Sequence, residues 1–317
     1  MILITGSAGY IGSHICYYLD KKKLNYIGID NLSYSYKKNI TNKKKFIKVD
    51  ISNSRELDKI ISKNKIKTVI HTAAFSYVVE GEISKTKYYN NNIIKTKKFI
   101  DCCKKNNIEN FIFLSSSNVY KEKKNNSAYK ENNFLKPKNF YGKNKLIIEK
   151  YLNKKFNKKI ILRLFNVVGI FNKNFIIFKF KKKNYQRLIF KLIQNIKLNK
   201  STNINFFKIN NKIVYPARDF VDVKDVVKII EKILYMINSR KKISEIINVG
   251  SGKSIDINKI VNLLNKVRNN RCRINLKEIS KKELFYTRSN ITKLSKIIGK
   301  KPKLNLNSII KSHFKKL

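Results

Sequence analysis

Short apolar runs alternate with longer amphipathic segments along the first half of the chain. The runs at residues 2–5, 26–29 and 67–71 have the length of buried strands. Segments between them, such as residues 10–22 and 54–63, carry apolar residues at helical spacing. This alternation predicts an α/β fold of the Rossmann type, a doubly wound parallel sheet with helices on both faces.

The same rhythm continues to Gly169 and then weakens. It adds strands at residues 45–49, 111–115 and 160–164, and helices at 87–106 and 141–156. Later segments predict helices at 188–198 and 224–238 and strands near 205–208 and 246–249, while residues 171–184 are basic, aromatic and irregular. We therefore predict a Rossmann domain over residues 1–169, to which 218–243 return, and a smaller mixed α/β C-terminal lobe over 170–317.

The chain is strongly basic, with 71 Lys and Arg against 20 Asp and Glu and a formal net charge of +51. A basic surface is expected of a protein that binds phosphates. Here the basic residues are mostly lysine, whereas bidentate recognition of phosphates and bases favours arginine. Lysine is also abundant in segments of every kind, together with Asn and Ile, which share A- and T-rich codons. We therefore favour compositional drift over a nucleic-acid partner.

The cysteines and the apolar runs bear on metal binding and location. Cys16, Cys102, Cys103 and Cys272 lack metal-ligand spacing and the three histidines are scattered, so we expect no metal site. No apolar run approaches the ~18 residues that span a membrane. The first strand begins at Met1 without a preceding signal segment, so we expect a cytoplasmic protein.

Three glycines stand between the first predicted strand and the first predicted helix. Gly6, Gly9 and Gly12 allow a tight turn, the approach of backbone to a pyrophosphate, and packing of the helix on the sheet. The helix N-terminus supplies N–H groups and a positive dipole end. Asp30, which ends the second strand, can accept hydrogen bonds from ribose hydroxyls and would repel the extra phosphate of NADP. The pattern predicts NAD as the cofactor.

Other strand ends offer weaker candidates for the same cofactor. Asp50 follows the third strand and is either an acceptor for the adenine amine or a solvated turn residue. Ala73 and Ala74 follow the fourth strand, where small side chains leave room for a cofactor or serve ordinary packing.

A tyrosine and a lysine lie four residues apart at the start of a predicted helix, and therefore on one face. They are Tyr141 and Lys145, and Ser116 ends the fifth strand upstream of them. Hydride can leave a carbinol carbon only if the hydroxyl proton is removed, and a tyrosine does this only when its pKa is lowered. Lys145 and a positive nicotinamide ring would lower it, while Ser116 would hold the reacting oxygen.

These motifs resemble those of the extended short-chain dehydrogenase/reductase family, and among its members the nucleotide-sugar 4-epimerases. Further matches are Arg163-Leu-Phe-Asn166-Val-Val-Gly169 and Arg218-Asp219-Phe220-Val221. The resemblance implies that Asn166 and Arg218, with Ser116 and Tyr141, bind the substrate. It implies contacts with NAD for Tyr10, Ile11, Asn31, Ile51, Asn91, Tyr141 and Lys145.

The implied reaction is inversion at C4 of a UDP-hexose, UDP-glucose or UDP-galactose, through a 4-keto intermediate with Tyr141 as general base. The resemblance also implies a substrate-binding role for the smaller lobe, and a homodimer formed through the helices at 87–106 and 141–156. The alternatives are 4-epimerases of UDP-GlcNAc or UDP-glucuronate, or a dehydratase or reductase of the same family. A basic nucleic-acid- or membrane-binding protein on a decayed fold is the alternative outside enzymes.

Departures from the family pattern bear on these alternatives. Ser117 and Asn118 stand where related dehydratases carry an acid pair, which disfavours dehydration. The arginine of the family's R-x-G-D stretch is replaced by Ser280, and Lys281 or Lys282 could substitute for its charge.

Overall fold

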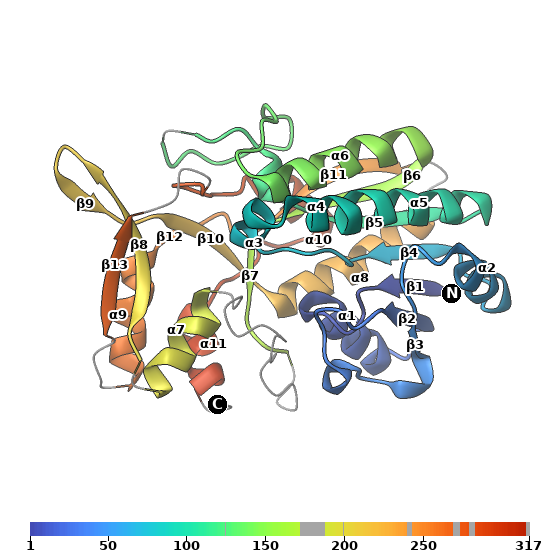
Figure 1. Ribbon diagram of the computed structural model, residues 1–317, viewed down its shortest axis with the longest axis horizontal. Helices are drawn as coiled ribbons and strands as arrows, with labels where there is room; N and C mark the ends of the chain where they lie inside the picture. The colour runs from blue at the N-terminus through green and yellow to red at the C-terminus, as the bar shows by residue number, and fades with distance from the viewer. Residues whose placement is uncertain are drawn as a thin grey trace.

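The computed structural model describes residues 1–123, 125–171, 188–198, 200–239, 243–268, 273–278 and 283–314. A seven-stranded sheet lies at its centre, in the order β11-β6-β5-β4-β1-β2-β3 (Figure 1). Every neighbouring pair is parallel. The strands are β1 (Ile2–Thr5), β2 (Tyr26–Asp30), β3 (Phe46–Lys48), β4 (Thr68–His71), β5 (Asn110–Ser116), β6 (Lys158–Leu164) and β11 (Ile243–Val249). This order confirms the predicted Rossmann-type α/β fold, with the chain reversing its direction of winding between β1 and β4.

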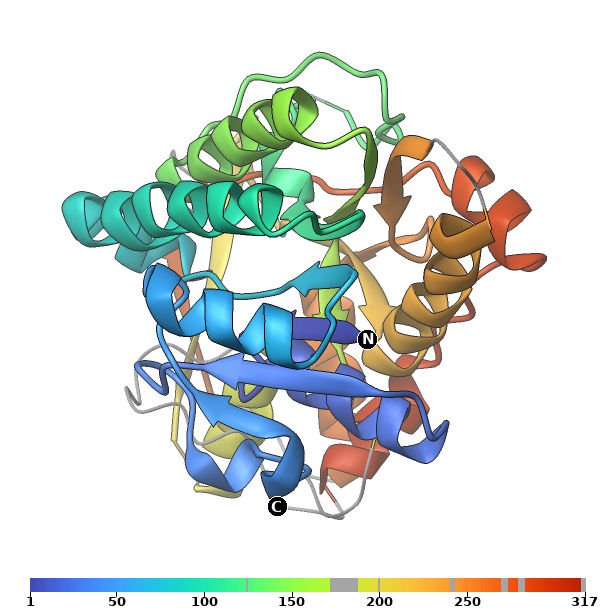
Figure 2. The ribbon, with the colours of Figure 1, turned by 90° about the vertical axis from the view of Figure 1, so that its right-hand side faces the viewer.

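Helices cover both faces of this sheet (Figure 1, Figure 2). Successive strand residues point to opposite faces, so Ile4 packs with α1 (Tyr10–Lys21) and α8 (Val223–Ser239). Leu3 belongs to the opposite core, which is formed with α2 (Ser54–Lys63), α5 (Thr96–Lys105) and α6 (Phe140–Lys155). The continuous apolar strands predicted from the sequence are therefore buried on both sides.

The helix predicted at residues 87–106 is interrupted in the structure. It consists of α4 (Lys85–Tyr89), a π-helical turn η3 (Asn90–Lys95) and α5, and a short helix α3 (Val78–Ile83) precedes it. The side-chain amide of Asn92 donates to the carbonyl oxygen of Phe75 (2.9 Å) and accepts from its N–H (2.8 Å). The wider turn thus occurs where the helix holds the loop after β4, a long-range contact that helical periodicity does not report.

Two small sheets and four helices form the rest of the described fold. One sheet has the order β12-β10-β7 and the other β13-β8-β9. The strands are β7 (Asn166–Val168), β8 (Thr202–Ile209), β9 (Lys212–Val214), β10 (Ala217–Asp222), β12 (Ser254–Asp256) and β13 (Ile274–Glu278). The helices are α7 (Leu188–Lys197), α9 (Ile257–Arg268), α10 (Thr292–Ile298) and α11 (Leu306–Phe314). Helices α7, α9 and α11 share an apolar core of their own.

These elements confirm a smaller mixed α/β region, although several of them are absent from the sequence prediction. Strand β13, for example, alternates Ile274 and Leu276 with polar residues over only five positions, all of them exposed, and is not among the predicted strands. Short 3₁₀ turns occur at Lys37–Asn39, Lys43–Lys45 and Ser117–Val119. The division into domains at residue 169 stays a prediction, and residues 172–184 of the irregular basic segment lie outside the described residues.

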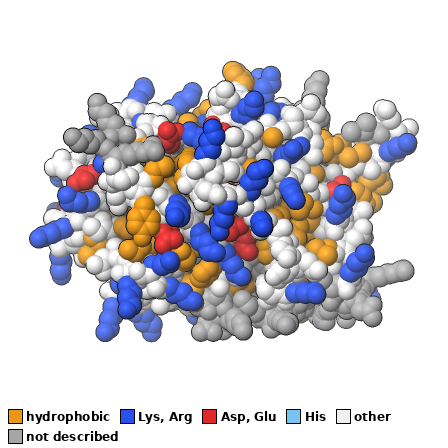
Figure 3. Space-filling view, turned by 180° about the vertical axis from the view of Figure 1, so that it is seen from behind, with side chains coloured by type: hydrophobic (Ala, Val, Ile, Leu, Met, Phe, Trp, Pro, Cys, Tyr) orange, Lys and Arg blue, Asp and Glu red, His pale blue; other side chains and the backbone are white. Residues whose placement is uncertain are grey.

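Basic side chains are spread over the molecular face seen in Figure 3, with acidic and apolar side chains between them. They do not gather into a single stripe on that face, which is the arrangement expected of drift in composition. Within the described ranges, no helix is both long and apolar enough to cross a membrane.

Candidate active site

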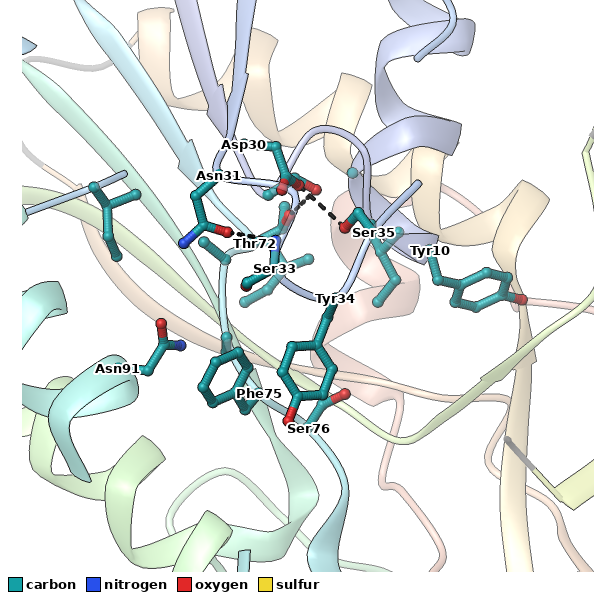
Figure 4. Close-up of a pocket in the computed structure, with 18 of the residues that line it drawn as sticks. Tyr10, Asp30, Asn31, Ser33, Tyr34, Ser35, Thr72, Phe75, Ser76 and Asn91 are labelled. Carbon is teal, nitrogen blue, oxygen red and sulfur yellow. Dashed lines mark hydrogen bonds between the residues drawn. The ribbon is translucent and has the colours of Figure 1, made fainter. Parts of the chain in front are cut away.

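A cavity opens at the carboxyl end of the parallel strands, where loops from several of them meet (Figure 4). It brings together most of the predicted site residues, which are far apart in the sequence. Those that line it are Gly6, Gly9, Tyr10, Ile11, Gly12, Asp30, Asn31, Ile51, Ala73, Ala74, Asn91, Tyr141 and Lys145. Tyr34, Phe75, Ser76 and Tyr77 are among the lining residues to which no motif in the sequence points.

The glycine turn has the close contacts that exclude side chains. Gly6 has a φ of +66°, and a Cβ there would lie 2.8 Å from the backbone of Ala73. A Cβ on Gly12 would lie 2.1 Å from the carbonyl oxygen of Gly6. The N–H of Gly9 donates to that same oxygen (2.9 Å), and α1 begins at the next residue. The turn therefore presents a helix N-terminus to the cavity, where backbone N–H groups can bind phosphate oxygens.

Asp30 is held in place by groups around it. Its carboxylate accepts hydrogen bonds from the N–H groups of Leu32 (2.7 Å) and Ala8 (3.1 Å), and from the Ser35 hydroxyl (3.3 Å; Figure 4). The residue is buried and lines the cavity beside the glycine turn. An acceptor fixed at this strand end can bind the hydroxyls of a ribose whose phosphate lies on α1.

Asp50 is not among the residues that line the cavity. Its carboxylate accepts from Lys95 Nζ (2.7 Å), Asn31 Nδ2 (2.7 Å) and the N–H and hydroxyl of Ser52. Burial opposes its ionisation, but these hydrogen bonds outweigh that effect and hold its pKa below the usual range. Asp50 therefore orients Asn31, which does line the cavity, and neither reading of Asp50 from the sequence includes this role.

Tyr141 and Lys145 lie on the first turns of α6 and line the cavity. Asn139 caps this helix by accepting from the N–H of Gly142 (2.8 Å). Lys145 Nζ donates to the carbonyl oxygen of Leu114 (2.7 Å) and lies 5.9 Å from the centroid of the Tyr141 ring. Burial lowers the pKa of Lys145 to about 7, against the opposing charge of Glu149. An ammonium at this position favours the phenolate form of Tyr141.

We expect the buried charge of Lys145 to make stability depend on pH. Its ordinary pKa is 10.5 and its folded value is about 7, so the unfolded chain binds more protons between these values. Wild-type stability therefore rises with pH across this window. Lys145→Met lacks this ionisable group, so we expect the variant to unfold at a higher temperature than the NAD-free wild type at pH 7. The difference between the two unfolding temperatures should shrink towards pH 10. Thermal unfolding from pH 6 to pH 10 measures this, and a constant difference would contradict the burial argument.

Ser116 ends β5 but is not among the residues that line the cavity. Its hydroxyl accepts from the backbone N–H (3.2 Å) and side-chain amide (3.1 Å) of Asn118. Asn118 Oδ1 in turn accepts from Asn139 Nδ2 (2.9 Å), so these contacts link Ser116 to the N-terminus of α6. A Cβ on Gly142 would lie 2.2 Å from the Asn118 carbonyl oxygen, which shows how closely this segment packs on the helix. In the sequence Asn118 stands out only as a position where related dehydratases carry an acid, and its contact with Asn139 is long-range and leaves no local pattern.

Asn166 and Arg218 lie outside this cavity, on the neighbouring parallel strands β7 and β10. Asn166 Nδ2 donates to the Asp219 carbonyl oxygen (3.0 Å). Arg218 Nη1 donates to the carbonyl oxygen of Phe285 (2.9 Å), and its Nη2 is 3.8 Å from a carboxylate oxygen of Glu283. Their predicted contact with a diphosphate stays a prediction. Lys281 and Lys282, the candidate substitutes for the missing arginine, lie outside the described residues.

A buried ion pair supports α6 against the sheet. Arg163, 1% exposed, donates from Nη2 (2.7 Å) and Nε (3.1 Å) to the two carboxylate oxygens of Glu149. Glu149 lies one turn after Lys145 and also accepts from the Ser115 hydroxyl (2.5 Å). The Arg163 guanidinium stacks over the Tyr120 ring, 4.8 Å from its centroid. This bidentate pair fixes the helix that carries Tyr141 and Lys145.

The groups that line the cavity are suited to binding a dinucleotide and to transferring a proton. Backbone N–H groups at a helix N-terminus bind phosphates, and an acid at the next strand end binds a ribose. Beside them, a tyrosine next to a buried lysine can take up and return a proton. This combination defines an α/β enzyme that uses a dinucleotide. In the part of the chain that the structure describes, no cluster of His, Cys, Asp and Glu could hold a metal ion.

Comparison with known proteins narrows this class to one family. The model of the NAD dependent epimerase/dehydratase family matches residues 2–250, and the chain belongs to that family. NAD is therefore its cofactor. The UDP-glucose 4-epimerase of Dictyostelium discoideum is 30% identical over 278 residues, which cover 83% of this chain and 80% of that protein.

Two solved structures also resemble the whole chain. The UDP-N-acetylglucosamine 4-epimerase of Methanobrevibacter ruminantium M1, in complex with UDP-N-acetylmuramic acid, is 27% identical with a TM-score of 0.83, covering 99% of this chain and 96% of that one. The UDP-glucuronic acid 4-epimerase of Bacillus cereus, in complex with UDP-glucuronic acid and NAD, is 26% identical with a TM-score of 0.83, covering 99% and 98%. The relatives thus act on different UDP-sugars.

Proposed function

We propose that this protein inverts the configuration at C4 of a UDP-hexose, with UDP-glucose and UDP-galactose as the first candidates. One observation carries the proposal. Tyr141 and Lys145 line the same cavity as the glycine turn and Asp30, so the group that handles the proton and the groups suited to the cofactor share one space.

The residues of the chain would divide the reaction between them. Tyr141, as phenolate, accepts the proton of the C4 hydroxyl while the hydride leaves C4, which converts the alcohol to a ketone. Lys145 stabilises the phenolate by its charge, and Ser116 holds the C4 oxygen. For the second half, the ketone presents its other face, hydride returns to C4, and Tyr141 gives its proton back to the oxygen.

Two features of the cavity suit the pyrophosphate and the adenosine ribose of NAD. Gly6 and Gly12 leave no room for side chains where the pyrophosphate would approach α1, and the Asp30 carboxylate is placed for the adenosine ribose. Ile51, Asn31, Ala73 and Asn91 would complete the nucleotide site. When bound, NAD⁺ supplies the hydride acceptor, and the cycle ends with no net oxidation.

The substrate is proposed from the relatives and from the sequence motifs together. A UDP-hexose agrees with the Dictyostelium relative, and UDP-GlcNAc or UDP-glucuronate with the two structural neighbours. Asn166 and Arg218 would bind the diphosphate, which requires Arg218 to exchange its weak contact with Glu283 for the substrate. The absence of acids at Ser117 and Asn118 favours epimerisation over dehydration.

The direct test is to incubate the NAD-loaded protein with UDP-galactose, UDP-GlcNAc and UDP-glucuronate, each in a separate reaction. We expect UDP-galactose to be converted to UDP-glucose without net formation of NADH. Chromatography of the reaction mixture monitors the conversion. Conversion of only another sugar would move the assignment to that substrate. A 4-keto-6-deoxy product would indicate a dehydratase, and accumulation of NADH would indicate a reductase releasing its cofactor.

We also propose a homodimer that forms through the helical segments at residues 87–106 and 141–156. Exposed apolar side chains on α4 and α6 support it, since Tyr89 is 45% and Ile147 38% exposed. Such side chains on neighbouring helices would be covered by a second copy.

A further inference from the structure

Two loops that line the cavity contact each other through a pair of aromatic rings. Tyr34 comes from the loop after β2 and Phe75 from the loop after β4, and their ring centroids are 4.3 Å apart (Figure 4). Lys87 Nζ lies over both rings, 4.6 Å and 5.1 Å from their centroids. Each contact is of the kind that aromatic and cationic side chains favour.

A buried acid holds these side chains together. The Glu80 side chain is 2% exposed, and it accepts hydrogen bonds from the Tyr34 hydroxyl and from Lys87 Nζ (3.0 Å). The Tyr88 hydroxyl lies 3.1 Å from its other oxygen. Burial raises the pKa of Glu80, but the hydrogen bonds from Tyr34 and Lys87 outweigh it and the pKa is lowered. The carboxylate therefore stays charged and attracts both partners.

The two sides of this contact are anchored independently. Phe75 is held through its backbone by Asn92 of the π-helical turn. On the other side, Ser35 donates to Asp30, so the loop that carries Tyr34 is fixed to the end of β2. Tyr34 is thus the side chain that joins one anchored loop to the other.

The order of the strands places this contact over the glycine turn. In the sheet, β1 lies between β2 and β4, and the glycine turn follows the carboxyl end of β1. A contact between the loops after β2 and β4 must therefore pass over that end. The glycine turn, Tyr34 and Phe75 line one cavity, so a ligand on the N–H groups of the turn would lie close to this contact.

We propose that Tyr34, Glu80 and Lys87 form a latch that slows the release of NAD, an inference that rests on the cavity being the NAD site. A latch of this kind suits the proposed reaction. Hydride is taken from C4 and returned to C4 in one cycle, so the cofactor has no need to leave between turnovers. These three residues would act by positioning and retaining the cofactor, not by touching the reacting atoms.

Two mild substitutions test the latch. Tyr34→Phe keeps the ring on Phe75 but removes the hydroxyl that joins Glu80 and Lys87, and Lys87→Met removes a half-exposed ammonium. The chain offers a matched control away from the cavity. On α6 and α5, Tyr151 donates to Asp101 (2.7 Å) and Lys155 Nζ lies 2.9 Å from the same carboxylate. Tyr151→Phe and Lys155→Met therefore remove the same groups from a Tyr–Lys–acid cluster at the surface, whose acid Asp101 is exposed where Glu80 is buried.

The experiment measures how fast bound NAD is lost. Each protein is loaded with NAD, freed of excess by gel filtration, and diluted into a scavenging enzyme that consumes free NAD. We expect Tyr34→Phe and Lys87→Met to release NAD about three- to tenfold faster than the wild type, as loss of one or two hydrogen bonds predicts. Tyr151→Phe and Lys155→Met should release it at the wild-type rate. Excess NAD should restore the turnover of the latch variants, which a distorted active site would not allow.

The possible results distinguish failure of the latch proposal from failure of the proposed cofactor site. If the wild type retains NAD and both latch variants retain it equally long, the latch is wrong and the cofactor site stands. If the wild type binds NAD in excess but loses it on gel filtration, the latch is wrong and the cofactor site stands; if replacing Asp30 leaves NAD binding unchanged, the assignment of the cavity as the cofactor site is wrong. Equal acceleration in the control variants would also overturn the latch, because the effect would then come from general loosening of the fold.

Discussion

Tyr141→Phe should lower turnover of the UDP-sugar by about 10²- to 10⁴-fold while the protein still retains NAD. The substitution removes the proposed general base, and while the C4 hydroxyl keeps its proton, hydride cannot leave the carbon to form a ketone. The glycine turn and Asp30 are untouched, so the proposed contacts with NAD remain. Single-turnover kinetics and bound NAD, measured on the same preparation, check both parts of this expectation.

A control for this experiment lies on the same helix. Tyr151 also belongs to α6, but its hydroxyl donates to Asp101 at the surface. Tyr151→Phe should therefore keep wild-type turnover. Near-wild-type turnover by Tyr141→Phe would refute the role of Tyr141 as general base, whereas loss of NAD from that variant would show that the tyrosine is mainly a binding residue.

Glu149→Leu should destabilise the fold by about 3–5 kcal/mol, because it leaves the Arg163 guanidinium buried without its partner. Both side chains are almost fully buried, at 1% and 3% exposure, so water cannot take the place of the carboxylate. The variant also removes the acceptor of the Ser115 hydroxyl. Urea unfolding at pH 7 measures the loss in the free energy of unfolding.

The double variant Glu149→Leu/Arg163→Met shows whether the lone charge is the cause. With both charges replaced by apolar groups, we expect most of the lost stability to return. Glu56→Gln breaks an exposed pair with Lys59 on α2 and should change stability by less than about 0.5 kcal/mol. A loss of under about 1 kcal/mol in the Glu149→Leu variant would show that Arg163 finds other partners, and would contradict the argument.

Most of the central sheet and the cofactor end of the site could be predicted from the sequence. Buried parallel strands appear as apolar runs, and the glycine turn and Asp30 each lie next to a strand, so the order of elements places them together. Tyr141 and Lys145 share a helical face, and their four-residue spacing reports this directly. Such local patterns can be recognised even in a chain with a net charge of +51, because they consist of particular residues at particular positions and do not depend on overall composition.

Other parts of the site depend on contacts that no local pattern encodes. Asp50 faces Asn31 and Lys95 where the sequence suggested the adenine amine or solvent. The π-helical turn at Asn90–Lys95 interrupts a segment whose periodicity predicts a continuous helix. In each case the partner is brought in by the packing of another element.

The sequence by itself determined the class of fold, the glycine turn with Asp30, and the pairing of Tyr141 with Lys145, because each is written in neighbouring residues. Only the tertiary structure decided the pairing of Arg163 with Glu149, the burial that brings the pKa of Lys145 to about 7, and the contact of Tyr34 with Glu80 and Lys87. These depend on how closely distant segments pack and how completely they exclude water. Hydrogen bonds and charges gain their strength from that exclusion, which spacing along a chain does not specify.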